Sequence, residues 1–335
     1  MMNEMSEGLQ REWDQHLKEL LDERMKVIHD HTHTSASLQR SHDLIMKKAV
    51  CLALKRTEGE WGESPTHFTF FLMGSGARLE QAFWSDQDHG IIYEGESEWH
   101  RDYFVRLGRN IVDALSQVGY EPCDGHVMAS NRKWCMSLDE WKIQLNGWLK
   151  ENKWESLRYT LTFFDSRVLI GEEKLLHALK SYLFSYVEEH PFLLKRFTEN
   201  TGRLRKGTGL FNQLLVETKG KHQGMFDLKQ IVLFPYVNGM RLLALKHQIY
   251  EPSTLERFEQ LPQIHQAIKN KQKSYERLLE KRIEWTKHVK EYDRVHHVSL
   301  KDIRAEDQKL LKKWVKEGHQ LYREIERAFK EGEWT

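Results

Sequence analysis

The chain has 335 residues, of which 39% are hydrophobic and 30% charged, and its formal net charge is +1. This near-neutral balance excludes strong attraction of the whole chain to nucleic acid or to a membrane surface, although a local basic patch is left open. Cys51, Cys123 and Cys135 show no CxxC spacing, and no basic region followed by an apolar run marks a signal peptide. A disulfide framework or zinc site is therefore not expected, and we predict a cytoplasmic protein without a membrane partner.

The first sixty residues predict a helical hairpin. Apolar residues recur at helical spacing from about residue 6 to residue 56, and the polar run from Asp30 to Thr34 interrupts them. The second helix is expected at about 36–56, with a polar loop over 57–65.

The middle of the chain alternates short β-prone runs with helical segments. Strands are expected at 67–73, 90–93 and 127–129. Helical periodicity is seen at 99–119, 138–150, 154–164 and 172–189. The block therefore combines strands with helices that separate them.

The chain becomes mainly helical after Pro191. Two strand candidates lie at 211–216 and near Phe226, and helices are expected to dominate from Ile231 onward. The tail predicts two long helices that are broken near the loop at His296-His297. We therefore predict three domains, over residues 1–60, 61–190 and 191–335.

A phosphate-binding turn is predicted where the first strand ends, at Gly74-Ser75-Gly76. Small residues let the backbone approach phosphate oxygens closely, and the N–H groups of such a turn donate to those oxygens. Arg78 follows with a guanidinium that suits phosphate bidentately. An ion pair between Arg78 and Glu80 that shapes the loop is an equally good interpretation.

A pair of carboxylates follows the turn. The run Ser85-Asp86-Gln87-Asp88 leads into the apolar strand expected at 90–93. Since side chains alternate along a strand, Asp86 and Asp88 are predicted to share one face. Two carboxylates on one face make a hard-oxygen site that suits Mg²⁺. Beside a phosphate-binding turn, such a pair is the minimum needed to transfer a nucleoside monophosphate.

These motifs carry a resemblance. The segment from Gly74 to Gln81, followed by Ser85-Asp86-Gln87-Asp88, resembles the DUF294 family of nucleotidyltransferase-fold proteins, which is related to the uridylyltransferase domain of the PII-modifying enzyme. Further matches are Gly125, Val127 to Asn131, Lys133-Trp134, Trp141, Phe164-Asp165, Arg167 and Gly171. The second half resembles the family's helical substrate-binding part at Asp227-Leu228-Lys229, Pro235, Arg241 and Ala244-Leu245.

The resemblance implies an α+β fold with a mixed sheet and flanking helices, preceded by the hairpin and followed by a helical bundle domain. It implies ATP or another NTP as co-substrate, and Mg²⁺ or Mn²⁺ as cofactor. Asp86 and Asp88 are then the catalytic metal ligands, and Asp124 is the candidate for a third carboxylate. The residues implied to bind nucleotide are Gly74, Ser75, Arg78, Glu80 and Gln81.

The expected activity is metal-dependent transfer of a nucleoside monophosphate from an NTP to an acceptor. The acceptor is a protein, a small molecule or an RNA end, and the near-neutral charge disfavours bulk RNA. The alternative is a nucleotide-binding regulatory or interaction module without turnover, which docks a partner protein through its C-terminal helices. A homodimer is left open.

Several residues outside the motif have structural interpretations. Asp165 and Arg167 are predicted to be a buried pair that braces helices, with a catalytic role as the alternative. Lys229 and Arg241 are interpreted as surface or interface pairs, with contact to phosphate as the alternative. The tryptophans are predicted to be core anchors, notably Trp134, Trp141 and Trp148.

Overall fold

The computed structural model describes residues 2–30 and 32–332 and divides into two compact units. Unit 1 is made of Met1–Gln144 and Ser166–Leu179, and unit 2 of Leu145–Asp165 and Lys180–Thr335. Unit 1 combines helices with a small mixed sheet and unit 2 is mainly helical, so the predicted α+β class is confirmed. In the described part of the chain, no helix has the length and apolar character needed to cross a membrane.

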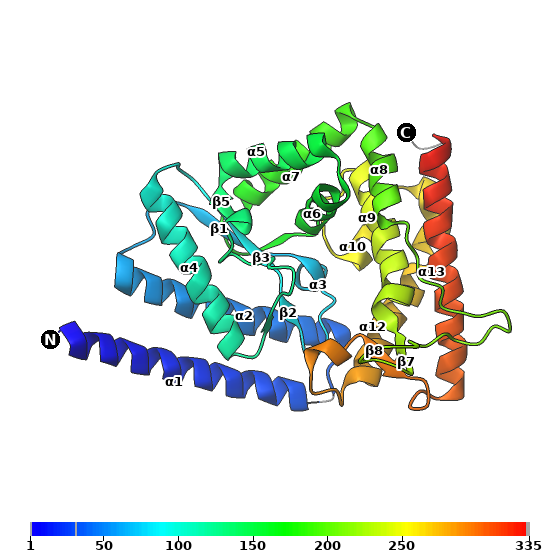
Figure 1. Cartoon of the computed structure of the whole chain (residues 1–335), viewed down its shortest axis with the longest axis horizontal. Helices are drawn as coiled ribbons and strands as arrows, with labels where there is room; N and C mark the ends of the chain where they lie inside the picture. Colours follow the sequence, from blue (N-terminus) through cyan, green and yellow to red (C-terminus); the bar gives the residue numbers. More distant parts are fainter. Residues whose placement is uncertain (1, 31, 333–335) are drawn as a thin grey trace. The chain divides into compact units, whose positions relative to one another are not determined.

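The N-terminal hairpin is confirmed as α1, Met2–His29, and α2, Ser35–Trp61 (Figure 1). Helix α2 begins at a capping box, because Thr34 accepts from the Ser37 N–H and the Ser37 side chain accepts from the Thr34 N–H. The predicted start of the following loop, at residue 57, is wrong, because helix α2 continues to Trp61. Thr57 lies within the helix, where it is buried and its hydroxyl donates to the Ala53 carbonyl.

The mixed sheet of unit 1 has the strand order β5-β3-β1-β6. The central strand β1 pairs antiparallel with β3 and β6, whereas β3 pairs parallel with β5. Its strands are β1 Phe68–Leu72, β3 His89–Tyr93, β5 Cys135–Ser137 and β6 Arg167–Gly171. The strands predicted at 67–73 and 90–93 are therefore confirmed.

The strand predicted at 127–129 is wrong. That segment turns, because the Asn131 N–H donates to the Met128 carbonyl and the Asn131 side chain accepts from the Lys133 N–H. The apolar character of the segment instead reflects burial, since Val127 and Met128 are both under 10% exposed. The edge strand of the sheet begins several residues later, at Cys135.

Alternating residues of β1 pack on the two faces of the sheet. Phe70 and Leu72 join the core formed with α2 and α4 (Glu98–Gln117). Phe71 points the other way, where its ring meets Trp141 edge-on at 5.8 Å between centroids. Trp141 and Trp134 are fully buried and Trp148 is 9% exposed, so these three are core residues as predicted, whereas the prediction is wrong for the exposed Trp99 and Trp154.

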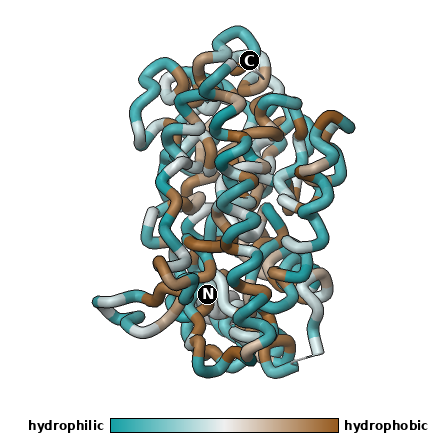
Figure 2. Tube along the Cα trace, turned by 90° about the vertical axis from the view of Figure 1, so that its right-hand side faces the viewer, coloured by the Kyte–Doolittle hydropathy of each residue, from teal (hydrophilic) through white to brown (hydrophobic). Residues whose placement is uncertain are grey.

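Unit 2 is mainly helical and has its own apolar core. Each long helix buries one side: on α13 these residues include Leu311, Trp314 and Leu321. Figure 2, viewed from the side of α13, shows hydrophilic and hydrophobic residues interleaved along the helices. The principal helices are α6 Trp154–Phe164, α8 Phe192–Thr201, α9 Phe234–Lys246, α10 Thr254–Gln260, α11 Gln266–Lys269, α12 Gln272–Thr286 and α13 Ala305–Glu331. Helices α5, Leu138–Glu151, and α7, Glu173–Glu189, contribute to both units.

A two-stranded sheet joins distant parts of unit 2. Strand β7, Met225–Asp227, pairs antiparallel with β8, His297–Ser299. The strand predicted near Phe226 and the break between the last two helices are thus confirmed, although the break holds a strand as well as loop. The strand predicted at 211–216 is wrong. Asn212 has φ +56° and Phe211 is 91% exposed, so the chain turns there, and Leu214 forms an isolated bridge with Thr208 and packs on the core of unit 2.

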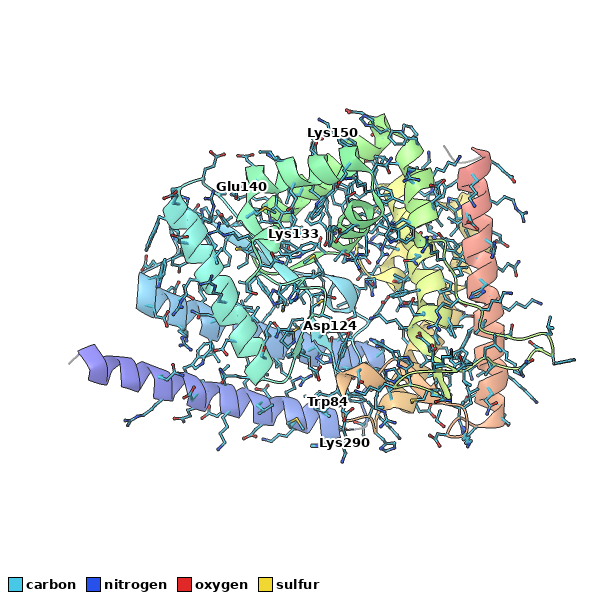
Figure 3. The ribbon with its side chains drawn as sticks, in the orientation of Figure 1. Trp84, Asp124, Lys133, Glu140, Lys150 and Lys290 are labelled. Atoms are coloured by element: carbon cyan, nitrogen blue, oxygen red, sulfur yellow. The ribbon has the colours of Figure 1, made fainter. Side chains whose placement is uncertain are left out.

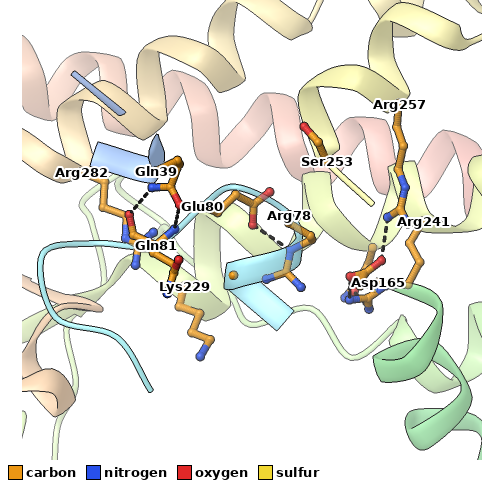
Figure 4. A network of polar contacts seen from close by, with 12 residues as sticks. Gln39, Arg78, Glu80, Gln81, Asp165, Lys229, Arg241, Ser253, Arg257 and Arg282 are labelled. Atoms are coloured by element: carbon orange, nitrogen blue, oxygen red, sulfur yellow. Dashed lines mark hydrogen bonds and ion pairs between the residues drawn. The ribbon is translucent and has the colours of Figure 1, made fainter. Parts of the chain in front are cut away.

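The partners of Asp165 and Arg167 differ from the predicted pair, since Arg167 binds Asp43 within unit 1 and Asp165 binds two arginines within unit 2. Asp165 is fully buried in unit 2, where Arg241 Nη2 lies 2.5 Å from Oδ2 and Arg257 Nη1 lies 2.8 Å from Oδ1 (Figure 4). Lys180 lies nearby and donates to the Tyr250 carbonyl; burial, and then the charge of Arg257, lower its pKa to about 7. The Asp165 carboxylate therefore compensates charge in a buried basic cluster. The predicted ion pairing of Arg241 is confirmed.

Candidate functional site

The turn after β1 forms the one-turn helix α3, Gly74–Ala77. Its first helical hydrogen bond runs from the Ala77 N–H to the Met73 carbonyl, so the N–H groups of Gly74, Ser75 and Gly76 precede that ladder. Gly74 has φ +56°, a left-handed conformation that glycine adopts without strain. The strand therefore delivers three backbone donors at its end, as the sequence predicts.

Asp86 and Asp88 lie on the same side of the chain because the residue between them points into the core. Gln87 is fully buried, and its Nε2 donates to the Tyr120 carbonyl at 2.9 Å and to Ser116 Oγ at 3.0 Å. This alternation confirms the shared face that was predicted for the two carboxylates.

His89 fixes the other end of the Gln87 amide. The Ala129 N–H donates to His89 Nδ1, which must therefore carry the lone pair, so Nε2 donates to Gln87 Oε1 at 3.1 Å. Burial lowers the pKa of His89 to about 3, which keeps this tautomer neutral. The two aspartates are thus positioned by a closed network beneath them.

The turn and the carboxylate pair meet at Gly74. The Met73 N–H donates to the Asp88 carbonyl at 2.8 Å. A Cβ placed on Gly74 would lie 2.2 Å from Asp88 Oδ2. The Asp88 carboxylate consequently occupies space that any larger residue at position 74 would take, and phosphate donors and metal-binding oxygens are brought to one place.

Cys123 is the third member of this group, and the sequence did not reveal it. One ligand atom from each of Asp86, Asp88 and Cys123 lies within 4.8 Å of the others. Strand β2, Asp86–Gln87, pairs in parallel with β4, Glu121–Pro122, so continuing the register places Cys123 opposite Asp88. Asp124, labelled in Figure 3, is exposed and is not a member of the group.

The donor set fits a hard divalent cation. Burial, followed by the charge of Asp88, raises the pKa of the Cys123 thiol to about 12, so this group is a neutral thiol. The charged donors are therefore the oxygens of Asp86 and Asp88, which are the ligand type that Mg²⁺ and Mn²⁺ prefer. No residue in the group requires a softer metal.

The predicted nucleotide-binding residues beyond the turn have partners within unit 1. Arg78 Nε donates to Glu80 Oε2 at 2.8 Å, and both side chains are under 10% exposed (Figure 4). The loop-shaping ion pair is therefore present. Gln81 exchanges two hydrogen bonds with Gln39 of α2 through its backbone, and its Nε2 donates to Ser85 Oγ. Contact of these three residues with a nucleotide stays a prediction.

Helix α2 braces the loop that follows the turn. Besides Gln39, His42 contacts the Ala82 carbonyl at 2.9 Å, and Asp43 binds Arg167. Arg167 in turn donates to the Gly76 carbonyl at 2.9 Å. The N-terminal hairpin thus holds the turn from one side, a function that its sequence did not indicate.

The buried contacts of His42 in α2 make the stability of the folded chain depend on pH. Its Nε2 faces a carbonyl and must be the donor, so Nδ1 accepts from the Tyr120 hydroxyl. Burial, and then Arg24, lower the pKa of His42 to about 3. Since the unfolded chain takes up this proton near pH 6.5, the stability that the neutral ring contributes is complete above that pH and is lost as the pH falls toward about 3.

We therefore expect the free energy of unfolding to fall with decreasing pH more steeply in the wild type than in His42→Gln. Between pH 6 and 4 the difference in slope should approach about 1.4 kcal/mol per pH unit, the value for one proton. Urea unfolding at a series of pH values measures both slopes. Equal slopes would show that His42 titrates alike in the folded and unfolded chains.

A second group of ligand atoms lies in unit 2 and consists of Glu217, Asp227 and His297. Arg205 spans its carboxylates, with Nη1 at 2.8 Å from Glu217 Oε1 and 2.9 Å from Asp227 Oδ2. Because one guanidinium already bridges both carboxylates, the group is an ion-pair cluster that holds β7.

Comparison with family models gives two matches that together cover most of the chain. The model described as "Putative nucleotidyltransferase DUF294" matches residues 11–155. The model described as "Putative nucleotidyltransferase substrate binding domain" matches residues 191–329. Comparison with curated proteins gives no match. The first match contains both the turn and the carboxylate pair, together with α2.

Proposed function

Because the chain belongs to the DUF294 family, we propose that it is a metal-dependent nucleotidyltransferase whose active site is the Gly74 turn with Asp86 and Asp88. The observation that carries this proposal is the close approach of Gly74 to Asp88 Oδ2. To bind an NTP, the donors that neutralise phosphate charge and the site for a hard cation must lie close enough to contact the same triphosphate. The proximity of Gly74 to Asp88 Oδ2 brings the two together.

The residues of the site have separable roles. The N–H groups of Gly74, Ser75 and Gly76 donate to phosphate oxygens, and Asp86 and Asp88 hold Mg²⁺ or Mn²⁺. When bound, the cation neutralises charge on the phosphates and orients them toward the acceptor hydroxyl. The oxygen of the acceptor hydroxyl forms a bond to the α-phosphorus, and its proton passes to solvent water. The bond from the α-phosphorus to the oxygen of the β-phosphate breaks, and pyrophosphate leaves with the electron pair.

Cys123 supports the second candidate, a nucleotide-binding module without turnover. The neutral thiol lies beside the carboxylate pair and cannot act there as a base at neutral pH. A site with two carboxylates binds a metal-nucleotide complex, but another group must then remove the proton from the acceptor hydroxyl. The two candidates differ only in whether label moves from the nucleotide to an acceptor.

A transfer assay separates them. The purified chain is mixed with each NTP carrying label on the α-phosphate, with Mg²⁺ or Mn²⁺ and cell lysate. Label that enters an acceptor in the wild type and not in Asp86→Asn supports transfer, and label on the γ-phosphate should stay out of the acceptor. Binding of nucleotide without transfer to any acceptor would favour the nucleotide-binding module without turnover. The absence of both nucleotide binding and transfer would contradict the proposal.

Gly74→Ala should weaken Mn²⁺ binding in the presence of NTP at least about 10-fold. The added Cβ would overlap Asp88 Oδ2, and φ of +56° costs a non-glycine residue about 1–2 kcal/mol. Electron paramagnetic resonance of free Mn²⁺ measures the affinity.

Gly76→Ala is the matched control for this variant. Its Cβ would meet Leu72 at 3.6 Å and Gln81 at 3.7 Å, which are ordinary contacts, and its backbone has no positive φ. We expect Mn²⁺ affinity within about twofold of the wild type. Equal losses in the two variants would mean that the loop, rather than the approach to Asp88, determines binding.

A further inference from the structure

Two tryptophans stack on the outside of unit 1. Trp61 is the last residue of α2 and Trp99 lies in the first turn of α4, and their ring centroids are 5.4 Å apart with an angle of 19° between the planes. Trp61 packs against the core of the unit, so the stack covers one face of Trp99 and leaves the outer part of its ring in solvent. Trp99 is 49% exposed, although burial of an indole is favourable. The pair therefore forms an aromatic surface that the described part of the chain leaves uncovered.

Carboxylates surround this aromatic pair. The segments 58–63 and 94–99 each contain three glutamates and one tryptophan, and neither contains a lysine or an arginine. Glu60 and Glu94 form ion pairs with basic residues of the unit. Within the described residues, the side chains of the other four form no ion pair or hydrogen bond: Glu58, Glu63, Glu96 and Glu98. These four glutamates and the two tryptophans form the acidic tryptophan surface, which carries excess negative charge.

A buried hydroxyl lies beside the same ring. Tyr103 follows Trp99 by one turn of α4, and their ring centroids are 6.4 Å apart. The Tyr103 side chain is 0% exposed, and its hydroxyl has no hydrogen-bond partner among the residues that the structure describes. Burial, and then the charge of Glu58, raise the pKa of Tyr103 to about 12, so the hydroxyl stays neutral. A buried hydroxyl without a partner is costly, and a donor bound between Trp99 and Glu58 would satisfy it.

We propose that the acidic tryptophan surface docks a segment of a partner protein that is rich in arginine or lysine. Both cations bind the open face of a tryptophan by cation–π interaction, and the planar guanidinium of arginine also stacks on it. The four glutamates neutralise the charge of the segment, and an N–H of a cation beside Glu58 donates to the Tyr103 oxygen. Nucleic acid and anionic lipid do not fit this surface, because their phosphates would meet its carboxylates.

The docking surface belongs to the same unit as the Gly74 turn. If the chain transfers nucleotides, as proposed above, the docked partner would be a basic protein acceptor. That step alone rests on the proposed function, since binding of a basic segment requires no turnover.

Fluorescence anisotropy of a labelled peptide tests the surface. The full chain is titrated into a fluorescein-labelled peptide of alternating arginine and glycine at about 0.15 M salt, where interactions between distant charges are screened. We expect saturable binding that Trp99→Ala weakens about 3–10-fold, the factor for loss of one cation–π contact. Trp154→Ala, at a tryptophan of unit 2 that is 46% exposed, is the matched control and should bind the peptide as the wild type does.

A charge variant tests the same surface without removing a ring. Glu63→Gln combined with Glu96→Gln should weaken the peptide at least about twofold, because two exposed charge pairs are lost. Glu12→Gln combined with Glu276→Gln replaces two exposed glutamates elsewhere and should leave the affinity unchanged. This pair of variants decides the question if Trp99→Ala is poorly folded.

The peptide experiments can overturn the proposal in three ways. These are an absence of saturable binding to the wild type, equal affinity in Trp99→Ala and Trp154→Ala, and equally tight binding of a peptide of alternating glutamate and glycine. Peptide binding together with a failed transfer assay would leave the docking surface standing and remove the proposed function. Transfer without peptide binding would remove only the docking surface.

Discussion

Asn in place of Asp88 is expected to reduce nucleotidyl transfer by about 10²–10³-fold, the range for removing one group that stabilises transition-state charge. The free energy of unfolding should stay nearly unchanged. The amide has the shape of the carboxylate, and in the metal-free protein it relieves repulsion between two like charges whose oxygens lie within 4.8 Å. Transfer of α-labelled NTP and thermal unfolding in the absence of metal measure the two quantities.

Asp124→Asn is the matched control for Asp88→Asn. Asp124 is exposed and lies outside the ligand group, although it is close to Cys123 in sequence. We expect transfer within about twofold of the wild type. Full activity in Asp88→Asn, or an equal loss in Asp124→Asn, would contradict the assignment of the Asp86–Asp88 pair.

Replacing Asp165 with alanine should lower the free energy of unfolding of unit 2 by about 3–5 kcal/mol, because removing one partner of a buried ion pair leaves an uncompensated charge. Here Arg257 is fully buried, Arg241 is 13% exposed, and both bind the same carboxylate. Hydrogen exchange of peptides from α9 and α10 under increasing urea would locate the loss in this unit.

Asp302→Asn provides the control for the stability experiment. Asp302 is an exposed aspartate of the same unit, and surface substitutions usually change the free energy of unfolding by less than about 0.5 kcal/mol. A loss below about 1 kcal/mol in Asp165→Ala would mean that water or rearrangement compensates both arginines. In that case the cluster would not be the main brace between α9 and α10.

The local features of the site could be predicted because they depend on neighbouring residues. The strand that ends just before the Gly74 turn and the alternation of Asp86, Gln87 and Asp88 follow from short-range patterns. Cys123 could not be found in this way, since its place beside Asp88 comes from the parallel pairing of β2 with β4, which are distant in sequence. The only feature of the sequence that pointed to Cys123 was its position one residue before Asp124, the candidate for a third carboxylate.

The partners of Asp165 and Arg167 and the contacts of α2 were also missed because they join residues that are distant in sequence. Asp165 and Arg167 are two residues apart, yet the boundary between the units falls after Asp165, so each meets a partner that is remote in sequence. The brace from Gln39 and His42 to the loop after the turn is likewise a tertiary contact. Helix periodicity predicted α2 itself, but it could not show which elements the polar residues of α2 would contact.

On the proposed function, the Gly74 turn and the Asp86–Asp88 pair bind one metal-nucleotide complex. A crystal structure with Mn²⁺ and a non-hydrolysable NTP tests it most directly. We expect anomalous density at about 2.0–2.3 Å from an oxygen of each aspartate, the range for a small divalent cation, with the phosphates against the N–H groups of Gly74 to Gly76. Phosphates bound away from the turn, or Mn²⁺ bound without contact to Asp86 and Asp88, would contradict the account.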